Sequence, residues 1–331
     1  MPNPEITKNL IKKGNHLYAL KKYEEALECY EKALKLNPNS AQAWSNKGMA
    51  LRAMGRVKEA LECYKEALEL DENLLEAWLN KGNALRILRK FDEALKCYDH
   101  VLKIKYDIPQ AWINKGATLR AKGMLEEALK CYDHALNLDP LNPDIWNNRG
   151  NVLHLLGLNE EALNSFNKAI EIDEKIDTSW FNKGIVLYKV GRLEEALKCF
   201  NSALEIEPNF VEALVNKGEL LQLLGELEGS LEYFNRALNI NPNDAKAWIN
   251  KGVTLYHLGE FEKALKCFNQ ALRIEPQNSK IWLNLGVTLY TIKEKKRAMG
   301  CFTRAINLDP SIEPMIKKAG FLPIKKRSNN K

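Results

Sequence analysis

Apolar residues recur along this chain at the spacing of helices, and the same arrangement returns every 34 residues. Within residues 109–142, Trp112 and Leu119 lie on one helical stripe, and Leu129 and Tyr132 lie on a second. No alternating pattern of period two appears anywhere, so strands are not expected. The pattern therefore predicts two helices in each 34-residue unit.

The ends of the two helices carry recognisable stop signals. Gly123 is suited to a left-handed residue just after the first helix. Pro140 follows the second helix, which a proline cannot continue. Gly116 and Ala128 are small enough to let the two helices approach closely. Each unit is therefore expected to be a tight pair of helices.

A period of 34 divides residues 7–312 into nine repeats without an insertion or deletion. Numbering each repeat from 1 to 34, position 8 is glycine in all nine, and all seven tryptophans fall at position 4. Six of the twelve prolines occupy position 32. The expected repeats are 7–40, 41–74, 75–108, 109–142, 143–176, 177–210, 211–244, 245–278 and 279–312.

Two further segments follow the last repeat. Residues 313–320 are expected to form a C-terminal capping helix, in which Met315, Ile316 and Ala319 cover the last apolar face. Residues 321–331 carry four basic and no acidic side chains, and we expect a disordered basic tail.

The repeat resembles the tetratricopeptide repeat, whose motif positions are matched in order by Trp112, Gly116, Leu119, Ala128, Tyr132, Ala135 and Pro140. The resemblance covers residues 7–312 and implies an all-α fold, a right-handed α-solenoid or superhelix of stacked helix-turn-helix units. It also implies a concave groove that binds a peptide segment of another protein. The implied function is a non-enzymatic scaffold for protein–protein interaction.

Composition and charge agree with a protein of this kind. The net charge is only +6, which is well short of a protein that coats nucleic acid. The first ten residues lack the apolar segment of a signal peptide, and no apolar run approaches the ~20 residues that span a bilayer. A cytoplasmic protein without a membrane partner is therefore expected.

Cysteines and histidines offer the sharpest alternative chemistry. All seven cysteines share position 23, and equivalent positions of stacked helices lie about 8–10 Å apart, too far for a disulfide. Cys97 with His100, and Cys131 with His134, could each supply two zinc ligands, but they lie on successive helices and cannot converge on one ion. We expect free thiols, no metal and no cofactor.

Catalytic motifs are not found in the sequence. It contains neither a GxxxxGK[ST] phosphate loop nor an HExxH zinc helix. The continuous 34-residue period also leaves no room for a catalytic domain. The chain is not expected to be an enzyme.

The first helix of each repeat should present positions 2, 6, 9 and 13 away from the core. Position 6 is asparagine in eight repeats, although asparagine is a poor helix former. Its amide can donate to and accept from the main chain of an extended peptide, so we expect a peptide-binding row; inheritance by duplication is the alternative. The row consists of Asn46, Asn80, Asn114, Asn148, Asn182, Asn216, Asn250 and Asn284.

Position 12 is the candidate for selectivity within the groove. An arginine row suits acidic side chains or phosphates, and an aromatic row suits apolar or proline-rich segments. The alternative left open is that each arginine packs its stem across a helix seam and pairs with a nearby glutamate. The predicted selectivity residues are Arg52, Arg86, Arg120, Tyr188, Tyr256 and Tyr290.

Three alternatives exist for the partner. A carboxylate clamp of the co-chaperone type is disfavoured because position 5 holds Ile11, Leu79 and Asn147 instead of lysine. A nucleic-acid-binding array that uses the arginine row and the basic tail is the main alternative, although acidic residues are plentiful. Self-association through terminal repeats remains open, and the sequence does not identify the protein or peptide partner.

Overall fold

The computed structural model describes residues 4–321, which form nineteen α-helices, one short 3₁₀ helix and no strand. The chain divides into two compact units, unit 1 (residues 1–174) and unit 2 (residues 175–331). The predicted all-α fold is therefore confirmed for the described residues.

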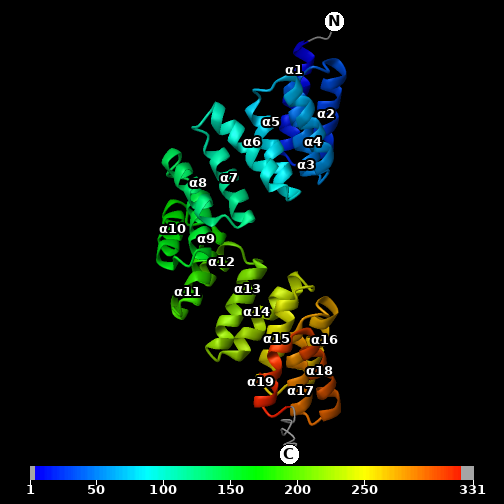
Figure 1. Ribbon diagram of the computed structural model, residues 1–331, viewed down its shortest axis with the longest axis vertical. Coiled ribbons are helices and arrows are strands. Elements are labelled where there is room, and N and C mark those ends of the chain that lie inside the picture. Colours follow the sequence, from blue (N-terminus) through cyan, green and yellow to red (C-terminus); the bar gives the residue numbers. More distant parts are fainter. Residues whose placement is uncertain (1–3, 322–331) are drawn as a thin grey trace, which may run out of the picture. The chain divides into compact units, whose positions relative to one another are not determined.

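Both units are built from successive antiparallel helix pairs (Figure 1). The first helices of unit 1 are α1 (Pro4–Ala19), α3 (Ala41–Ala53), α5 (Leu75–Ile87), α7 (Pro109–Lys122) and α9 (Pro143–Leu155). Its second helices are α2 (Tyr23–Leu36), α4 (Val57–Leu70), α6 (Phe91–Ile104), α8 (Leu125–Leu138) and α10 (Asn159–Ile172).

Unit 2 continues the pattern and ends with two extra elements. Its first helices are α11 (Asp177–Lys189), α13 (Val211–Leu223), α15 (Ala245–His257) and α17 (Ser279–Thr291). Its second helices are α12 (Leu193–Ile206), α14 (Leu227–Ile240), α16 (Phe261–Ile274) and α18 (Lys295–Leu308). The 3₁₀ helix η1 (Pro310–Ile312) and α19 (Glu313–Lys318) follow.

Within a repeat, the two helices meet where the position-8 glycine faces the aromatic ring at position 24. A Cβ atom built on any of the nine glycines would lie only 2.5–3.0 Å from a ring atom. The nine rings, from Tyr30 to Phe302, are at most 1% exposed. The distance between the paired helices is therefore set by an aromatic ring resting directly on backbone.

Between repeats, the position-4 tryptophan is hydrogen-bonded to the turn that precedes its helix. In six repeats its indole Nε1 donates a hydrogen bond of 2.8–3.0 Å to the carbonyl oxygen of position 32 in the preceding repeat, as Trp112 does to Tyr106. The apolar indole fills the seam while its polar edge is satisfied by the turn.

The cation at position 7 lies over the same indole. Lys115 Nζ is 5.4 Å from the centroid of the Trp112 ring and 2.7 Å from Asp99 Oδ1 of the preceding repeat. Arg149 repeats the arrangement with Asp133 at 2.7 Å. The position-7 side chain therefore belongs to the seam between repeats, and at Lys115 and Arg149 a carboxylate of the preceding repeat neutralises its charge.

Each first helix ends in the same turn. The backbone N–H of position 16 donates to the carbonyl of position 11 in all nine repeats at 2.8–3.0 Å, the long bond of a Schellman motif. Position 15 is therefore left-handed, with Gly123 at φ 86°. Lys21, Arg89 and Lys293 take this position at φ 59–67° where glycine is missing. The stacking thus holds position 15 in the left-handed conformation even where lysine or arginine, which rarely adopt it, replaces glycine.

The C-terminal end differs from the sequence expectation in two places. Ile316 of α19 is buried, but Met315 is 52% exposed and Ala319 is exposed as well, so neither of these two covers the last apolar face. Phe321, expected in the tail, stacks on Phe302 with ring centroids 5.3 Å apart. The remainder of the predicted basic tail, residues 322–331, lies outside the described residues.

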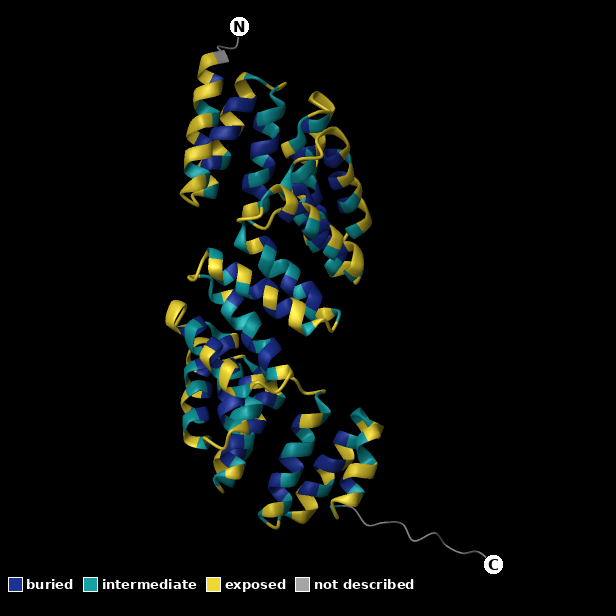
Figure 2. Cartoon of the chain, turned by 90° about the vertical axis from the view of Figure 1, so that its left-hand side faces the viewer, coloured by how far each residue is buried: buried dark blue, intermediate teal, exposed yellow. Residues whose placement is uncertain are grey.

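The seven cysteines are buried free thiols, as expected. Burial raises the pKa of Cys63, Cys97 and Cys131 to about 11, although nearby lysines oppose the rise. In Figure 2 buried residues run as stripes along the helices, and the loops carry many of the exposed ones. Cys63, Cys97 and Cys131 are therefore protonated core side chains at neutral pH.

We expect Gly150→Ala to lower the free energy of unfolding by about 2 kcal/mol, because the new Cβ would lie 2.7 Å from the Phe166 ring. Gly300→Ala is the matched control, since nothing lies within 4 Å of a Cβ added there. It should gain up to about 1 kcal/mol from helix propensity. Guanidinium unfolding followed by tryptophan fluorescence measures both, and equal effects would contradict the contact.

We also expect stability to fall as the pH rises from 7.5 to 9.5. In the unfolded chain a thiol loses its proton near pH 8.5, whereas the buried thiols hold theirs up to about 11, so the unfolded state binds fewer protons in this range. Each thiol should cost about 1 kcal/mol at pH 9.5.

The triple variant Cys63→Ala, Cys97→Ala, Cys131→Ala tests this pH dependence. Guanidinium unfolding at the two pH values should show a clearly smaller loss in the variant than in the natural chain. Identical losses would show that other groups cause the pH dependence.

Candidate functional site

The first helices of each unit present a polar face, here called the first-helix face, made of positions 2, 6, 9, 12 and 13. Side chains on this face bond across neighbouring repeats. Gln42 Nε2 donates to Glu76 Oε2 at 3.1 Å, and the hydroxyls of Tyr256 and Thr291 lie 3.1 Å apart. Each unit therefore has a continuous face on which side chains of consecutive repeats interact.

Two asparagines of the predicted row are buried in unit 1. Asn46 is 3% exposed; its Nδ2 donates to Asn15 at 2.8 Å and its Oδ1 accepts from Gln42 at 2.9 Å. Asn114 is 8% exposed; its Oδ1 accepts from Gln110 at 2.9 Å, but its buried Nδ2 has no partner among the described residues. The assumption that position 6 is exposed is therefore wrong for these two residues.

In unit 2 a charged pair engages two more asparagines. Asn250 Nδ2 donates to Glu219 Oε1 at 2.5 Å, and Lys246 binds Glu219 Oε2 at 2.9 Å. Lys246 also approaches Asn216 Oδ1 at 3.5 Å, while Asn216 Nδ2 donates to the Glu212 carbonyl. Glu219 is thereby neutralised by side chains of the next repeat.

The other four position-6 asparagines, Asn80, Asn148, Asn182 and Asn284, are half-buried. Within residues 4–321, the side chains of Asn80, Asn148 and Asn284 make no hydrogen bond. These three amides are available to a ligand, whereas Asn46 is fully engaged.

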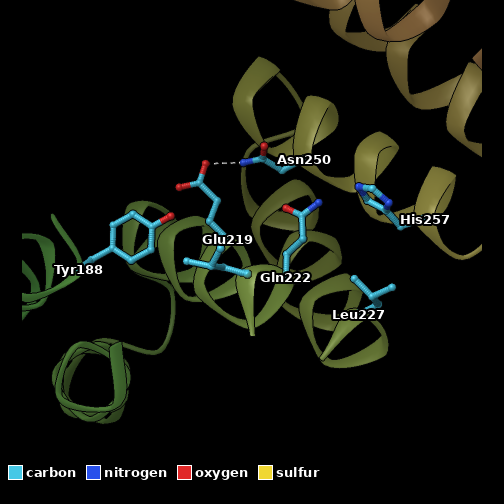
Figure 3. A pocket seen from close by; sticks show the side chains of 7 residues that line it. Tyr188, Glu219, Gln222, Leu227, Asn250 and His257 are labelled. Carbon is cyan, nitrogen blue, oxygen red and sulfur yellow. Dashed lines mark hydrogen bonds between the residues drawn. The ribbon is translucent and has the colours of Figure 1, made fainter. Parts of the chain in front are cut away.

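Unit 2 carries two neighbouring cavities on its first-helix face. The larger, of about 710 Å³, is lined by Tyr188, Glu219, Gln222, Leu223, Leu227, Asn250 and His257 (Figure 3). The smaller, of about 220 Å³, is lined by Val253, Tyr256, His257, Phe268, Asn284, Val287 and Thr288. His257 belongs to both cavities, so they adjoin. The larger cavity has both polar and apolar lining residues, and the lining of the smaller cavity is mainly apolar.

The predicted tyrosines do not share one environment. Tyr188 and Tyr256 line the larger and the smaller cavity, respectively. Burial and the charge of Glu219 raise the pKa of Tyr188. Tyr290 packs edge-on against Phe321, with ring centroids 5.0 Å apart, and lines neither cavity.

The predicted arginines of unit 1 lie near buried tyrosine hydroxyls. Burial raises the pKa of Tyr98 to about 12 and the charge of Arg86 opposes the rise. Arg86 and Arg120 both act on Tyr132 in this way. Within the described residues no carboxylate binds these arginines, so the alternative of pairing with a glutamate is wrong. The groups beside Arg86 and Arg120 are instead buried, neutral tyrosine hydroxyls, which leave the arginine charge without a counter-ion.

The suspected zinc ligands are ordinary packing residues. His100 lies against the Trp78 ring at 4.3 Å between centroids, and His134 stacks on Trp112 at 4.6 Å. In the described part of the chain, no group of three or more His, Cys, Asp or Glu side chains could hold a metal ion. No helix within residues 4–321 combines the length and apolarity needed to cross a membrane.

Several cavity residues were not predicted from the sequence. Glu219, Leu223 and His257 lie at positions 9 and 13, which helix geometry had assigned to the outward stripe. The signal was available at Glu219, because every other position 9 holds a neutral residue. Leu227 begins a second helix, and only the packing of that helix brings it to the face.

Family models match most of the chain. A model described as "Tetratricopeptide repeat" matches residues 41–74, 75–105, 143–176, 178–210, 211–244 and 245–278, and a second model with the same description matches residues 279–312. A related model described as "TPR repeat" matches residues 14–55 and 116–157. No curated protein sequence matches the chain.

Two solved structures share the fold, and a third is similar over part of the chain. The Cut9–Hcn1 hetero-tetramer of the APC/C matches with a TM-score of 0.62 at 13% identity, over 95% of this chain and 76% of that one. Pseudomonas aeruginosa PilF matches with 0.58 at 22% identity, over 64% and 97%. YrrB, described as a TPR protein with an unusual peptide-binding site, matches with 0.44 at 27% identity, over 56% and 96%.

Proposed function

The chain belongs to the tetratricopeptide repeat family, and from this premise we propose that it binds an extended peptide segment along the first-helix face of unit 2. In this proposal the protein is a non-enzymatic interaction scaffold. The observation that carries it is the pair of adjoining cavities at α11, α13, α15 and α17.

The size of the cavities suits side chains of a peptide. About 710 Å³ is within the usual range of ligand pockets, and about 220 Å³ accommodates one apolar side chain. Val253, Val287 and Phe268 give the smaller cavity an apolar lining. Burying a leucine-sized side chain there would contribute roughly 1.5–3 kcal/mol.

The polar groups of the cavities suit a peptide main chain. Gln222 and Asn284 present amides that can donate and accept, and each hydrogen bond would contribute roughly 1 kcal/mol net. Successive side chains of an extended peptide point to opposite sides, so residues two apart can enter the two cavities from one strand.

The charges at this face favour a neutral segment. Glu219 is the acidic residue in the lining, and Lys246 binds it at 2.9 Å. Neither cavity is lined by a lysine or an arginine. Selectivity in unit 2 is therefore proposed to come from shape and apolar contact.

A random 12-residue peptide library displayed on phage provides the test. Peptides selected on the full chain would be synthesised with a fluorophore, and their dissociation constants measured by anisotropy. Asn284→Ala should weaken binding about fivefold through the lost hydrogen bond. Val287→Glu should weaken it more than tenfold, because it places a charge in the apolar cavity.

Asn269→Ala is the matched control, because Asn269 is exposed on the second helix α16. It should leave the dissociation constant unchanged. Thermal melting verifies that all variants are folded. Selected peptides that bind the three variants equally, or a library without binders, would contradict the proposal.

A further inference from the structure

Three arginines on the first-helix face of unit 1 have no acidic partner. Arg52, Arg86 and Arg120 lie at position 12 of α3, α5 and α7, and no carboxylate in the described chain binds them. Arg56 and Arg149 of the same unit each bind a carboxylate, at 2.5 and 2.7 Å. The three positive charges on this face are therefore uncompensated.

The unsatisfied buried atoms beside these arginines include a set of hydrogen-bond donors. Arg52 Nε, Arg86 Nε and Asn114 Nδ2 are buried and have no hydrogen-bond partner within residues 4–321. Asn114 is 92% buried, and its Oδ1 is already occupied by Gln110. Each of these three atoms can only donate; the buried hydroxyls of Tyr64 and Tyr132, which can also accept, likewise have no hydrogen-bond partner within residues 4–321.

The helices themselves contain almost no negative charge. Among the residues of α3, α5 and α7, Glu76 is the one acidic side chain, and it accepts from Gln42 at 3.1 Å. Arg86 and Arg120 both influence the hydroxyl of Tyr132, so their charges act on the same region. The face is thus cationic and rich in free donors.

We propose that the first-helix face of unit 1 binds an acidic segment of a partner protein, whose carboxylates pair with Arg52, Arg86 and Arg120. A guanidinium binds a carboxylate through two parallel hydrogen bonds, which the Nη groups of these half-buried arginines can donate while the buried Nε atoms stay out of reach. The proposal rests on the proposed function only in treating the first-helix face as a peptide surface, because it concerns another unit and other residues.

Geometry gives the spacing of the acidic residues. The first helices of neighbouring repeats pack directly against each other, at roughly 8–10 Å between axes. An extended peptide advances about 3.3 Å per residue. Carboxylates three residues apart therefore match arginines one repeat apart.

The probe is a fluorescein-labelled 13-residue peptide with glutamate at every third position, separated by glycine and serine. The matched peptide carries glutamine instead. We expect the full chain to bind the glutamate peptide at least tenfold more tightly. The double variant Arg86→Gln, Arg120→Gln should reduce the preference for the glutamate peptide below threefold. The control is the double variant Arg56→Gln, Lys58→Gln, which removes the same amount of charge elsewhere and should keep the preference.

Arg86→Lys with Arg120→Lys retains charge without the paired donors and should give an intermediate preference. Melting temperatures verify the fold of every variant. The proposal is overturned if the natural chain binds the glutamate and glutamine peptides equally. It is also overturned if the control variant at Arg56 and Lys58 loses as much of the preference as the variant at Arg86 and Arg120. A single-stranded oligonucleotide of equal charge that binds more tightly, and is lost in the same double variant, would also overturn it.

Val287→Glu separates this proposal from the preceding one. This variant should lose the library-selected peptide but keep the glutamate peptide, because Val287 lies in unit 2. Failure of one peptide alone then identifies which proposal is wrong.

Discussion

The contact between a glycine and an aromatic ring is the constraint on which the rest of this structure depends. At position 8 a side chain would lie 2.5–3.0 Å from the ring at position 24, so the two helices of every repeat approach to the limit that backbone allows. The ring is thereby sealed from water, and the opposite side of the first helix is left for polar residues. Both candidate faces exist because this contact turns the same side of each first helix inward.

The residue at position 24 also influences the chemistry of the face. In repeats 1–4 the ring is a tyrosine and in repeats 5–9 a phenylalanine. A buried phenol needs a polar neighbour, and position 9 supplies one twice: Tyr30 donates to Asn15 Oδ1 and Tyr98 to Asn83 Oδ1, both at 2.9 Å. The charge of Arg86 at position 12 also acts on the Tyr98 hydroxyl. A phenylalanine has no such need, so position 12 becomes free to line a cavity, as Tyr188 does. The replacement of tyrosine by phenylalanine at position 24 thus accompanies the change from a cationic to a largely uncharged face.

The two units differ in charge as a result. Unit 1 presents arginines without carboxylate partners, whereas in unit 2 Glu219 and Lys246 neutralise each other beside an apolar cavity. Because both units contain the same tryptophan–carbonyl hydrogen bond and the same lysine over the indole, as at Trp112 and Trp248, these differences do not disturb the stacking. A repeat array can therefore vary its binding face while its core remains constant.

The sequence by itself determined the period, the helix pairs, the core positions and the free thiols, because each depends on spacing within a single repeat. It also identified the asparagine row, but not the state of its members. Asn46 is buried and fully bonded, Asn250 binds Glu219, and the side chain of Asn284 makes no hydrogen bond within residues 4–321. Only the tertiary structure decided this, because the partners come from positions 2 and 9, including those of neighbouring repeats, where the residues differ. The cavities have the same origin, since Leu227 and His257 reach one space only through packing.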